Sequence, residues 1–599
     1  MPLSIHDLVA IVVAFALSLA LTPVVRALAR RRGVVARPKT DRWHKKPTAM
    51  LGGVSISISF IIAYLAFVPH TGQTLIVMAA STFLFAVGLV DDIVHIKPYQ
   101  KLVGQVMGAA LVIYSGLMLP WTASPLLNMG ITIFWLAGIT NAINLLDNMD
   151  GLATGAGAIA SLFLALSFIA NGQPAEASML LIFAAVLLGF LVYNSNPASI
   201  FMGDCGSMFI GFFLASATLL SASGGRSRSL AAVLAVPVLI LFIPIFDTTF
   251  VTILRKLAGR AATQGGRDHT SHRLVALGMS ERRAVWMLYG FAALSGLLAL
   301  LVGEVKLDLS LAAILGFTVV LTLLGVYLAG VKVYDEDEAR IASDKPLVAF
   351  LVDLSYKRRI FEVLLDVALI ILSYYGAYVL LFGPVSENYE WGFFARTIPI
   401  LIAVKMLAFL TAGVYRGIWR YISIDNLITF VQAVALGSVA SVLVILFAYR
   451  FEGFSRAVFI LDAMLLLMML AGSRMAFRLF KRVLPVAQAG DGRRVLIYGA
   501  GDAGELLLRE LLNNREWKYK PVGFLDDDPF KSGKVIHGLR VFGGNGELRQ
   551  ICEEQHVNEV LISSSKFSEQ RIREIFHDCE QSQVALKRMR IQIEELGDL

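Results

Sequence analysis

Residues 128–171 read NMGITIFWLAGITNAINLLDNMDGLATGAGAIASLFLALSFIAN, and this stretch decides the class of fold. Two apolar runs, near 128–143 and 152–171, flank a short polar turn, and each approaches the ~20 residues that cross a bilayer. Between them, Asn141, Asn144 and Asp147 recur at every third residue, which places them on one face of a helix end. The stretch therefore predicts a pair of membrane-spanning helices with polar side chains gathered at their connected ends.

Long apolar runs of this kind extend over most of the chain. The 599 residues are 57% hydrophobic and 16% charged, against about 25% charged in soluble domains. The runs lie near 7–28, 51–69, 74–90, 102–119, 128–143, 152–171, 176–193, 206–222, 230–253, 284–303, 308–328, 360–382, 396–414, 426–449 and 456–473. We therefore predict a polytopic α-helical membrane protein with about 15 spans. This composition, with only three cysteines, excludes a disordered chain, a coiled coil and a secreted disulfide scaffold.

The loops between the runs indicate how the chain crosses the membrane. Arginine and lysine are concentrated in 30–46, after the first run, and in 255–283, after the ninth. Because cytoplasmic loops carry the excess of these residues, we expect the N-terminus outside and both loops in the cytoplasm. An odd number of spans then places the C-terminal part in the cytoplasm as well. These loops account for the formal charge of +8, so nucleic acid is not expected as a partner.

Five polar clusters fall at the cytoplasmic ends of the predicted spans. They contain Asp91, Asp92 and Lys101; Asn141, Asn144, Asp147 and Asp150; Asn194 and Asp204; Asp247; and Arg267, His269, His272 and Arg273. One carboxylate at a span end is commonly an interfacial side chain that reaches water, but five clusters at one face need another explanation. Carboxylate and amide oxygens suit Mg²⁺ and the basic groups suit phosphate, whereas His269 and His272 lack the further ligands of a zinc site. The pattern predicts a magnesium-dependent phosphate site.

The order of these motifs over residues 1–330 resembles one enzyme family. The matching residues are His44 with Pro47, Gly88–Asp92 with Lys101 and Gln105, Asn141–Gly155, Asn194–Ala198, Phe201–Ser207, Asp247 and His269–His272. The family is that of the polyprenyl-phosphate N-acetylhexosamine-1-phosphate transferases, relatives of the phospho-MurNAc-pentapeptide translocases. This chain departs from the family at Asn148, where glycine is common, and at Ser271, within a stretch that holds three histidines in the translocases. The second departure favours a simple HexNAc-phosphate substrate over MurNAc-pentapeptide.

The resemblance implies transfer of HexNAc-1-phosphate from a UDP-sugar such as UDP-GlcNAc to a polyprenyl phosphate such as undecaprenyl phosphate, with release of UMP. That reaction would be the first membrane step of polysaccharide or cell-envelope glycan synthesis, in the bacterial inner membrane. By resemblance, the catalytic residues are Asp91, Asp92, Lys101, Asp204, His269 and His272, and the substrate contacts are His44, Asn141, Asn144, Asp147, Asp150, Asn194, Arg267 and Arg273. Asp204 and Asn144 would hold Mg²⁺, or Mn²⁺ in its place. Direct attack by the lipid phosphate and a covalent intermediate on Asp91 or Asp92 both remain open.

The C-terminal part carries a different pattern. Gly499, Gly501 and Gly504 lie between a predicted strand, 494–498, and a predicted helix, 505–513, and Asp526 follows the next strand. This spacing is typical of a Rossmann-like dinucleotide-binding turn. The region resembles the N-terminal portion of membrane-bound nucleotide-sugar dehydratases and epimerases, but it lacks the Tyr-x-x-x-Lys pair of their catalytic domain. It would bind a nucleotide, a nucleotide sugar or a CoA-like ligand, or no ligand at all.

These patterns divide the chain into four regions. We expect a transmembrane transferase domain at 1–330, a cytoplasmic linker at 331–359, a four-span membrane domain at 360–480 and a Rossmann-like domain at 490–599. Two other functions compete: a transporter with a regulatory nucleotide-binding domain, and a scaffold for polysaccharide assembly. Transporters place polar sites near the bilayer midplane in repeated halves, whereas here the polar residues lie at one face. As protein partners, a second copy of this chain or a polysaccharide-assembly complex both remain open.

Overall fold

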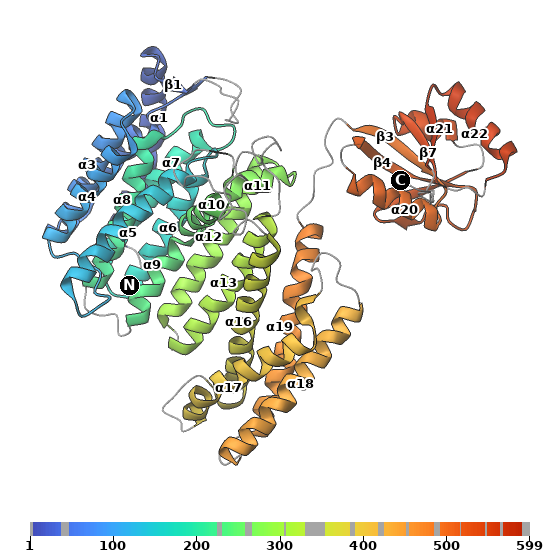
Figure 1. Cartoon of the computed structure of the whole chain (residues 1–599). Coiled ribbons are helices and arrows are strands. Elements are labelled where there is room, and N and C mark those ends of the chain that lie inside the picture. Colours follow the sequence, from blue (N-terminus) through green and yellow to red (C-terminus); the bar gives the residue numbers. More distant parts are fainter. Residues whose placement is uncertain are drawn as a thin grey trace. The chain divides into compact units, whose positions relative to one another are not determined.

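A computed structural model describes residues 4–36, 47–223, 230–257, 266, 268–304, 307–329, 354–383, 390–416, 424–450, 455–483, 492–514, 517–544, 548–563 and 567–589. The chain divides into two compact units, Met1–Pro485 and Val486–Leu599 (Figure 1). Two predicted site residues, His44 and Arg267, lie outside the described residues.

The first unit is a bundle of long helices. They are α1 (Ile5–Arg31), α2 (Gly52–Phe67), α3 (Gly72–Val94), α4 (Pro98–Tyr114), α5 (Pro125–Leu146), α6 (Leu152–Ala170), α7 (Pro174–Asn194), α8 (Gly203–Ser223), α9 (Leu230–Ile240), α10 (Phe242–Leu257), α11 (Thr270–Ala276), α12 (Glu281–Glu304), α13 (Leu307–Ala329), α16 (Leu354–Phe382), α17 (Glu390–Thr411), α18 (Ile424–Tyr449) and α19 (Arg456–Val483). Among the described residues, 11 helices are long and apolar enough to cross a membrane, and two shorter apolar helices lie at Gly52–Phe67 and Ile314–Ala329. The prediction of a polytopic helical membrane protein is confirmed, and the total of 15 spans stays a prediction.

Helix α8 lies at the centre of the N-terminal helices. In the part of α8 long enough to cross a membrane, 89% of the residues are buried inside the protein. The helix packs against α2, α3 and α5. Phe209 and Phe213 of α8 meet Phe60 of α2 and Phe183 of α7, with ring centroids 4.4–6.2 Å apart. Aromatic contacts of this kind stabilise packing beyond the area that they bury. The first turn of α8, which carries Asp204, is therefore held by neighbours on several sides.

Backbone hydrogen bonds fix the beginning of α8 next to that of α2. A small hairpin, β1 (Val35–Ala36) and β2 (Thr48–Ala49), precedes α2, and the Phe201 N–H donates to the Ala49 carbonyl at 2.8 Å. The N–H groups of Gly52 and Gly53 in turn donate to the carbonyls of Phe201 and Met202, at 2.9 and 2.8 Å. A side chain at Gly53 would place its Cβ only 2.2 Å from the Gly206 nitrogen, so this close crossing requires glycine.

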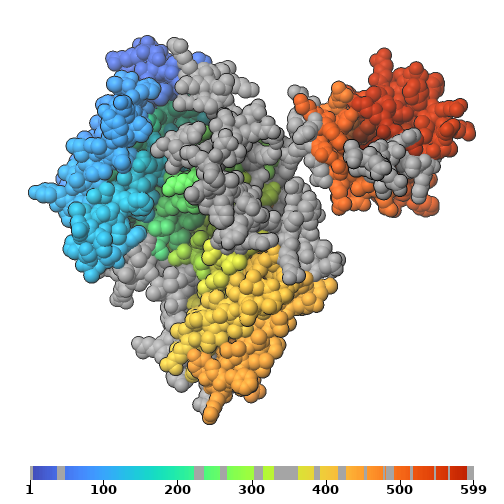
Figure 2. Space-filling view, in the orientation of Figure 1, coloured from blue at the N-terminus to red at the C-terminus, as the bar shows by residue number. Residues whose placement is uncertain are grey.

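Helices α16 to α19 pack mainly with one another and form the yellow and orange part of Figure 2. Two buried ion pairs lie among them: Lys405 contacts Asp462, and Arg474 contacts Asp366 at 2.7 Å. Charges inside a bilayer are costly unless they are paired, so these contacts hold the helices in register. Helix α13 packs against both α16 and α19, which places both groups of helices in one compact unit.

The second unit contains a six-stranded sheet with helices on both faces. The strands are β3 (Arg493–Tyr498), β4 (Tyr519–Asp526), β5 (Val535–Ile536), β6 (Leu539–Gly543), β7 (Glu559–Ile562) and β8 (Ala585–Arg588), and the helices are α20 (Asp502–Asn513), α21 (Leu548–Glu554) and α22 (Glu569–Gln581). The order is β5-β6-β4-β3-β7-β8, and only the β5–β6 pair is antiparallel. Alternate residues of β3 enter opposite cores: Val495 and Ile497 pack with α20, and Leu496 and Tyr498 with α21 and α22. This arrangement confirms the Rossmann-like prediction.

Candidate active site

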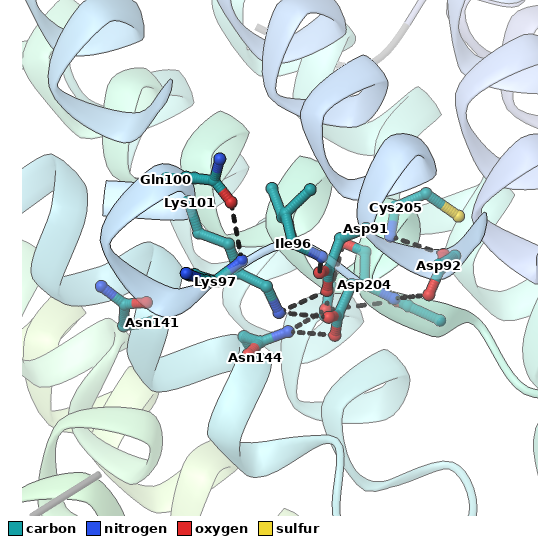
Figure 3. A network of polar contacts seen from close by, with 12 residues as sticks. Asp91, Asp92, Ile96, Lys97, Gln100, Lys101, Asn141, Asn144, Asp204 and Cys205 are labelled. Atoms are coloured by element: carbon teal, nitrogen blue, oxygen red, sulfur yellow. Dashed lines mark hydrogen bonds and ion pairs between the residues drawn. The ribbon is translucent and has the colours of Figure 1, made fainter. Parts of the chain in front are cut away.

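Side chains from four helices meet at the ends of α3 and α5 and the beginnings of α4 and α8 (Figure 3). The Lys101 ammonium contacts the carboxylates of both Asp91 and Asp204, and it lies 2.6 Å from Asp204 Oδ2. From α5, Asn144 Nδ2 donates to Asp204 Oδ1 at 2.7 Å and to Ser207 Oγ at 2.8 Å. The structure thus brings together four of the predicted site residues, and we refer to Asp91, Lys101, Asn144 and Asp204 as the carboxylate cluster.

The local sequence explains how Asp204 reaches this cluster. It occupies the first turn of α8, where a carboxylate is stabilised by the helix dipole. Opposite it, Gly88 lets the backbone of α3 approach closely, since a Cβ there would lie 2.5 Å from the Asp204 carbonyl oxygen. Asp91 is one turn further along α3 and is 7% exposed, so its carboxylate faces the interior of the bundle.

Asp92 points away from Lys101. Its Oδ1 accepts the backbone N–H of Asp204 at 2.8 Å, and its Oδ2 accepts that of Cys205 at 3.0 Å (Figure 3). Neighbouring residues on a helix project about 100° apart, so the two adjacent aspartates serve different partners. The Asp92 carboxylate caps the first turn of α8 and holds the backbone that carries Asp204.

A second group of polar side chains, residues 268–273, forms what we call the histidine loop. His269 Nδ1 lies 2.8 Å from Asp247 Oδ2 of α10, and the Thr270 N–H donates to Asp247 Oδ1 at the same distance. Arg255 forms a two-point ion pair with Asp268, at 2.6 and 2.7 Å. Ser271 Oγ donates to Asn148 Oδ1 at 2.7 Å, which connects this loop to the turn after α5.

Asp247 belongs to the sequence motif but was not predicted as a catalytic or substrate-binding residue. Its position at the end of an apolar run, where a carboxylate is unusual, could have indicated such a role. The structure shows why Asp247 matters: it is 3% exposed and orients the His269 ring. His272 is also buried, with its ring centroid 6.1 Å from that of His269. The two predicted histidines therefore lie together at the beginning of α11, with His269 as its N-cap and His272 in its first turn, and Asp247 holds this helix start.

Several predicted substrate contacts bind other parts of the protein. Asn141 exchanges two hydrogen bonds with Gln105, at 2.9 and 3.1 Å. Asn194 is 1% exposed, accepts a bond from Thr154 at 2.8 Å and donates to the Ile200 carbonyl at 3.0 Å. The Asn141 contacts connect α4 to α5, and the Asn194 contacts hold the segment before α8. All of these bonds are made within the protein.

The remaining predicted contacts lie around the turn between α5 and α6 and on the histidine loop. Asp147 ends α5 with its side chain half-buried, and Asp150 Oδ2 accepts the Ala198 N–H at 2.8 Å. Arg273 is 6% exposed and donates to backbone carbonyls of its own chain. The roles assigned to these residues, and to His44 and Arg267, stay predictions.

The carboxylate cluster suits a hard divalent cation. Lys101 brings the carboxylates of Asp91 and Asp204 to one shared cationic group, so the cluster already balances a positive charge. Among the described residues there is no group of three His, Cys, Asp or Glu side chains that could hold a metal. Mg²⁺ commonly uses one or two carboxylates and completes its shell with waters and substrate phosphates, so the donors present fit that ion.

In the Rossmann-like unit, the glycine turn follows β3 as predicted. Asp526 Oδ2 accepts the Ala500 N–H at 2.6 Å and a bond from Lys531 Nζ at 3.0 Å. Burial raises the pKa of Asp526, but the bonds from the Asp528 and Ala500 N–H groups and from Lys531 outweigh it and keep the pKa below its ordinary value. At Gly504 a Cβ would lie 1.9 Å from the Gly499 carbonyl oxygen, whereas at Gly501 it would meet no atom within 4 Å.

The membrane-length helices and the carboxylate cluster define a polytopic membrane protein with charged side chains gathered at helix ends. Residues 74–222 match the model of glycosyl transferase family 4, and residues 411–589 match the CoA-binding domain model. The chain is 33% identical over 318 residues to the "Probable undecaprenyl-phosphate N-acetylglucosaminyl 1-phosphate transferase" of Bacillus subtilis (strain 168), a match over 51% of this chain and 88% of that protein. The chain therefore belongs to the polyprenyl-phosphate N-acetylhexosamine-1-phosphate transferase family.

Two further relatives support this assignment. The decaprenyl-phosphate N-acetylglucosaminephosphotransferase of Mycobacterium tuberculosis (strain CDC 1551 / Oshkosh) is 32% identical over 311 residues, which cover 45% of this chain and 75% of that protein. The phospho-N-acetylmuramoyl-pentapeptide-transferase of Lactiplantibacillus plantarum (strain ATCC BAA-793 / NCIMB 8826 / WCFS1) is 35% identical over 237 residues, which cover 35% and 72%. The resemblance seen in the sequence motifs is confirmed, and the transporter alternative is not favoured.

Proposed function

We propose that this protein transfers an N-acetylhexosamine-1-phosphate from a UDP-sugar to a polyprenyl phosphate and releases UMP. The observation that carries the proposal is the convergence of Asp91, Lys101, Asn144 and Asp204 on one point at the beginning of the central helix α8. By analogy with the named relatives, UDP-GlcNAc and undecaprenyl phosphate are the substrates to test first.

In this reaction a phosphate oxygen of the lipid forms a bond to the sugar-bearing phosphorus, and the bond from that phosphorus to UMP breaks. The main obstacle is repulsion between two anionic phosphates. Asp204 and Asn144 would hold Mg²⁺ or Mn²⁺, which supplies charge neutralisation at the pyrophosphate. Lys101 would neutralise a phosphate oxygen. Asp91 or Asp92 would orient the lipid phosphate or accept its proton, and a covalent intermediate on one of these two aspartates remains the alternative.

The histidine loop would bind the other part of the donor. With Nδ1 of His269 directed at Asp247, the Nε2 atom is the one available for a phosphate or sugar oxygen. His272 and Arg267 would act beside it, and Asp150 would contact the uracil base. His44, Asp147 and the remaining predicted contacts stay part of this proposed substrate site.

The same proposal extends to the membrane and to the C-terminal unit. The active site and the Rossmann-like domain would face the cytoplasm of a bacterial inner membrane, with the N-terminus outside, because arginine-rich loops are expected on the cytoplasmic side. Gly499, Gly501, Gly504 and Asp526 would bind a nucleotide or nucleotide sugar. The open space at Gly501 and the match to the CoA-binding domain model support such a ligand.

The test is UMP release by the purified full-length protein with undecaprenyl phosphate and Mg²⁺. UDP-GlcNAc, UDP-GalNAc and UDP-MurNAc-pentapeptide are compared, and we expect release with at least one simple UDP-HexNAc. EDTA should stop the reaction, and added Mg²⁺ or Mn²⁺ should restore it. Folded protein that releases UMP with none of the UDP-HexNAc donors would refute the proposal.

A further inference from the structure

Arg273 joins the histidine loop to the end of a distant helix. Its Nε donates to the Asp268 carbonyl at 3.0 Å, and its Nη1 donates to the carbonyls of Leu328 at 3.1 Å and Ala329 at 3.5 Å. Leu328 and Ala329 are the last two described residues of α13. Arg273 is buried, so its guanidinium is held against these two carbonyls.

The atoms that Arg273 holds lie next to the proposed catalytic histidine. Asp268 immediately precedes His269, and its side chain is fixed by the two-point ion pair with Arg255. His269 then bonds to Asp247. Because Arg273 binds the carbonyl of Asp268, a displacement of the guanidinium shifts the backbone directly before His269 and so the position of its ring.

Helix α13 connects this contact to the second group of membrane helices. Leu323 of α13 lies in one core with Leu365 of α16 and Leu466 of α19. Near the end of α13, the Tyr327 ring contacts Phe480 of α19, with centroids 5.6 Å apart. Direct contacts therefore run from the histidine loop through the end of α13 to the last membrane helix before the Rossmann-like domain.

We infer that Arg273 is a positioning residue that acts through His269, and that the α13–α19 contact makes the histidine loop depend on the fused C-terminal helices. The inference rests on the proposed function. It differs from the sequence-based expectation, in which Arg273 contacts the substrate, because the guanidinium is buried against backbone carbonyls of three residues of its own chain.

The first test compares Arg273→Met, His269→Asn and the double variant in the full-length protein, with Arg283→Met as a matched control at an exposed arginine. We expect Arg273→Met to lower kcat by about 10- to 100-fold, with little change in KM for UDP-GlcNAc. In the His269→Asn background the same change should add less than about 3-fold, because both variants remove one effect. Additive losses, or a raised KM with kcat unchanged, would overturn the inference and favour a substrate contact.

A second variant guards against misfolding. Arg273→Lys keeps the charge but cannot reproduce the forked geometry, so its kcat should fall between those of wild type and Arg273→Met.

Tyr327→Ala tests the α13–α19 contact and should also lower kcat, whereas Val320→Ala, exposed on α13, should not. Unchanged kcat in Tyr327→Ala would refute the link to the fused helices.

Hydrogen exchange separates this inference from the proposed function. In Arg273→Met, amide exchange should rise in 268–276 and 325–329 and stay unchanged in 203–207, at the beginning of α8. If wild-type protein releases no UMP but exchange responds in this way, the proposed function fails and the structural coupling stands. If exchange in both segments is unchanged, the coupling itself is refuted.

Discussion

Replacing Asp92 with asparagine tests whether the second aspartate of the Asp91–Asp92 pair acts on substrate or on the protein. In the structure, both Asp92 oxygens accept backbone N–H groups of the first turn of α8, from Asp204 and Cys205. Asparagine has the same shape but only one acceptor oxygen, and its NH₂ group would face an N–H donor. The variant should therefore release the first turn of α8 without leaving a cavity.

The size of the effect follows from the bonds that are lost. A hydrogen bond to a charged group contributes about 1.5–3 kcal/mol, and Asp92→Asn removes one of two such bonds. If the displacement of Asp204 adds this whole free energy to the activation barrier of the transfer step, kcat falls by about 10- to 150-fold. Asp204→Asn, which removes a metal-binding carboxylate, should instead cost on the order of 10³-fold or more.

Gly203→Ala provides an independent way to disturb the same contact. Its Cβ would lie 2.5 Å from Asp92 Oδ2, at a backbone φ of +73° that disfavours a side chain. Gly138→Ala on α5 is the matched control, since a Cβ there meets no atom within 4 Å. We expect Gly203→Ala to resemble Asp92→Asn in rate and in thermal stability, and Gly138→Ala to resemble wild type.

The assay is UMP release in detergent, with thermal unfolding measured on the same samples. Asp92→Asn should lower both kcat and the unfolding temperature, and the protein should still respond to Mg²⁺. If Asp92→Asn is as inactive as Asp204→Asn and its unfolding temperature is unchanged, Asp92 takes part in the chemistry. The capping argument would then be refuted.

Three further predictions concern the metal, the domain boundaries and the C-terminal turn. Asp204→Asn should nearly abolish transfer at every Mg²⁺ concentration while the protein stays folded, and near wild-type turnover at low Mg²⁺ would contradict the metal assignment. A chain that ends at Pro485 should transfer at the wild-type rate, whereas one that ends at Val331 should transfer more slowly, because the α13 carbonyls that Arg273 binds become a fraying terminus. Equal rates for the two fragments would show that the fused helices do not support the site. Gly501→Val should block nucleotide binding, measured by ligand titration, without changing the unfolding temperature. Gly504→Ala should lower the unfolding temperature. If Gly501→Val leaves the nucleotide affinity unchanged, this turn is not the phosphate site.

Much of the fold could be predicted from the sequence because its signals are local. The run near 128–143 became α5 (Pro125–Leu146), and the glycine turn follows β3 as predicted. Its helix α20 begins at Asp502, earlier than the predicted 505, so Gly504 lies in the first turn of the helix. Apolar length, proline at a helix start and glycine after a strand act within a few residues of their own position. The predicted linker at 331–359 is less well bounded: α16 begins at Leu354, and 330–353 lie outside the described residues.

The carboxylate cluster could be predicted only in part from such local signals. Sequence reasoning selected Asp91, Lys101, Asn144 and Asp204 because they lie at the cytoplasmic ends of predicted spans. The alternation of spans places such ends on one side of the membrane, but it does not determine which side chains meet. The direct contacts of Lys101 with both carboxylates come from the packing of α3 against both α4 and α8.

The amino-acid sequence is enough to assign this protein to the membrane-embedded helical enzymes with a Rossmann-like domain, and it predicts which polar residues lie at one face. The folded protein adds that Asp92 caps a helix 112 positions away in sequence, and that Arg273 binds α13, 55 positions away. The physical reason is that a side chain's direction around its helix gains a partner only through packing with distant segments. Local periodicity carries no information about that partner, so the difference between a catalytic and a positioning residue appears only in the folded protein.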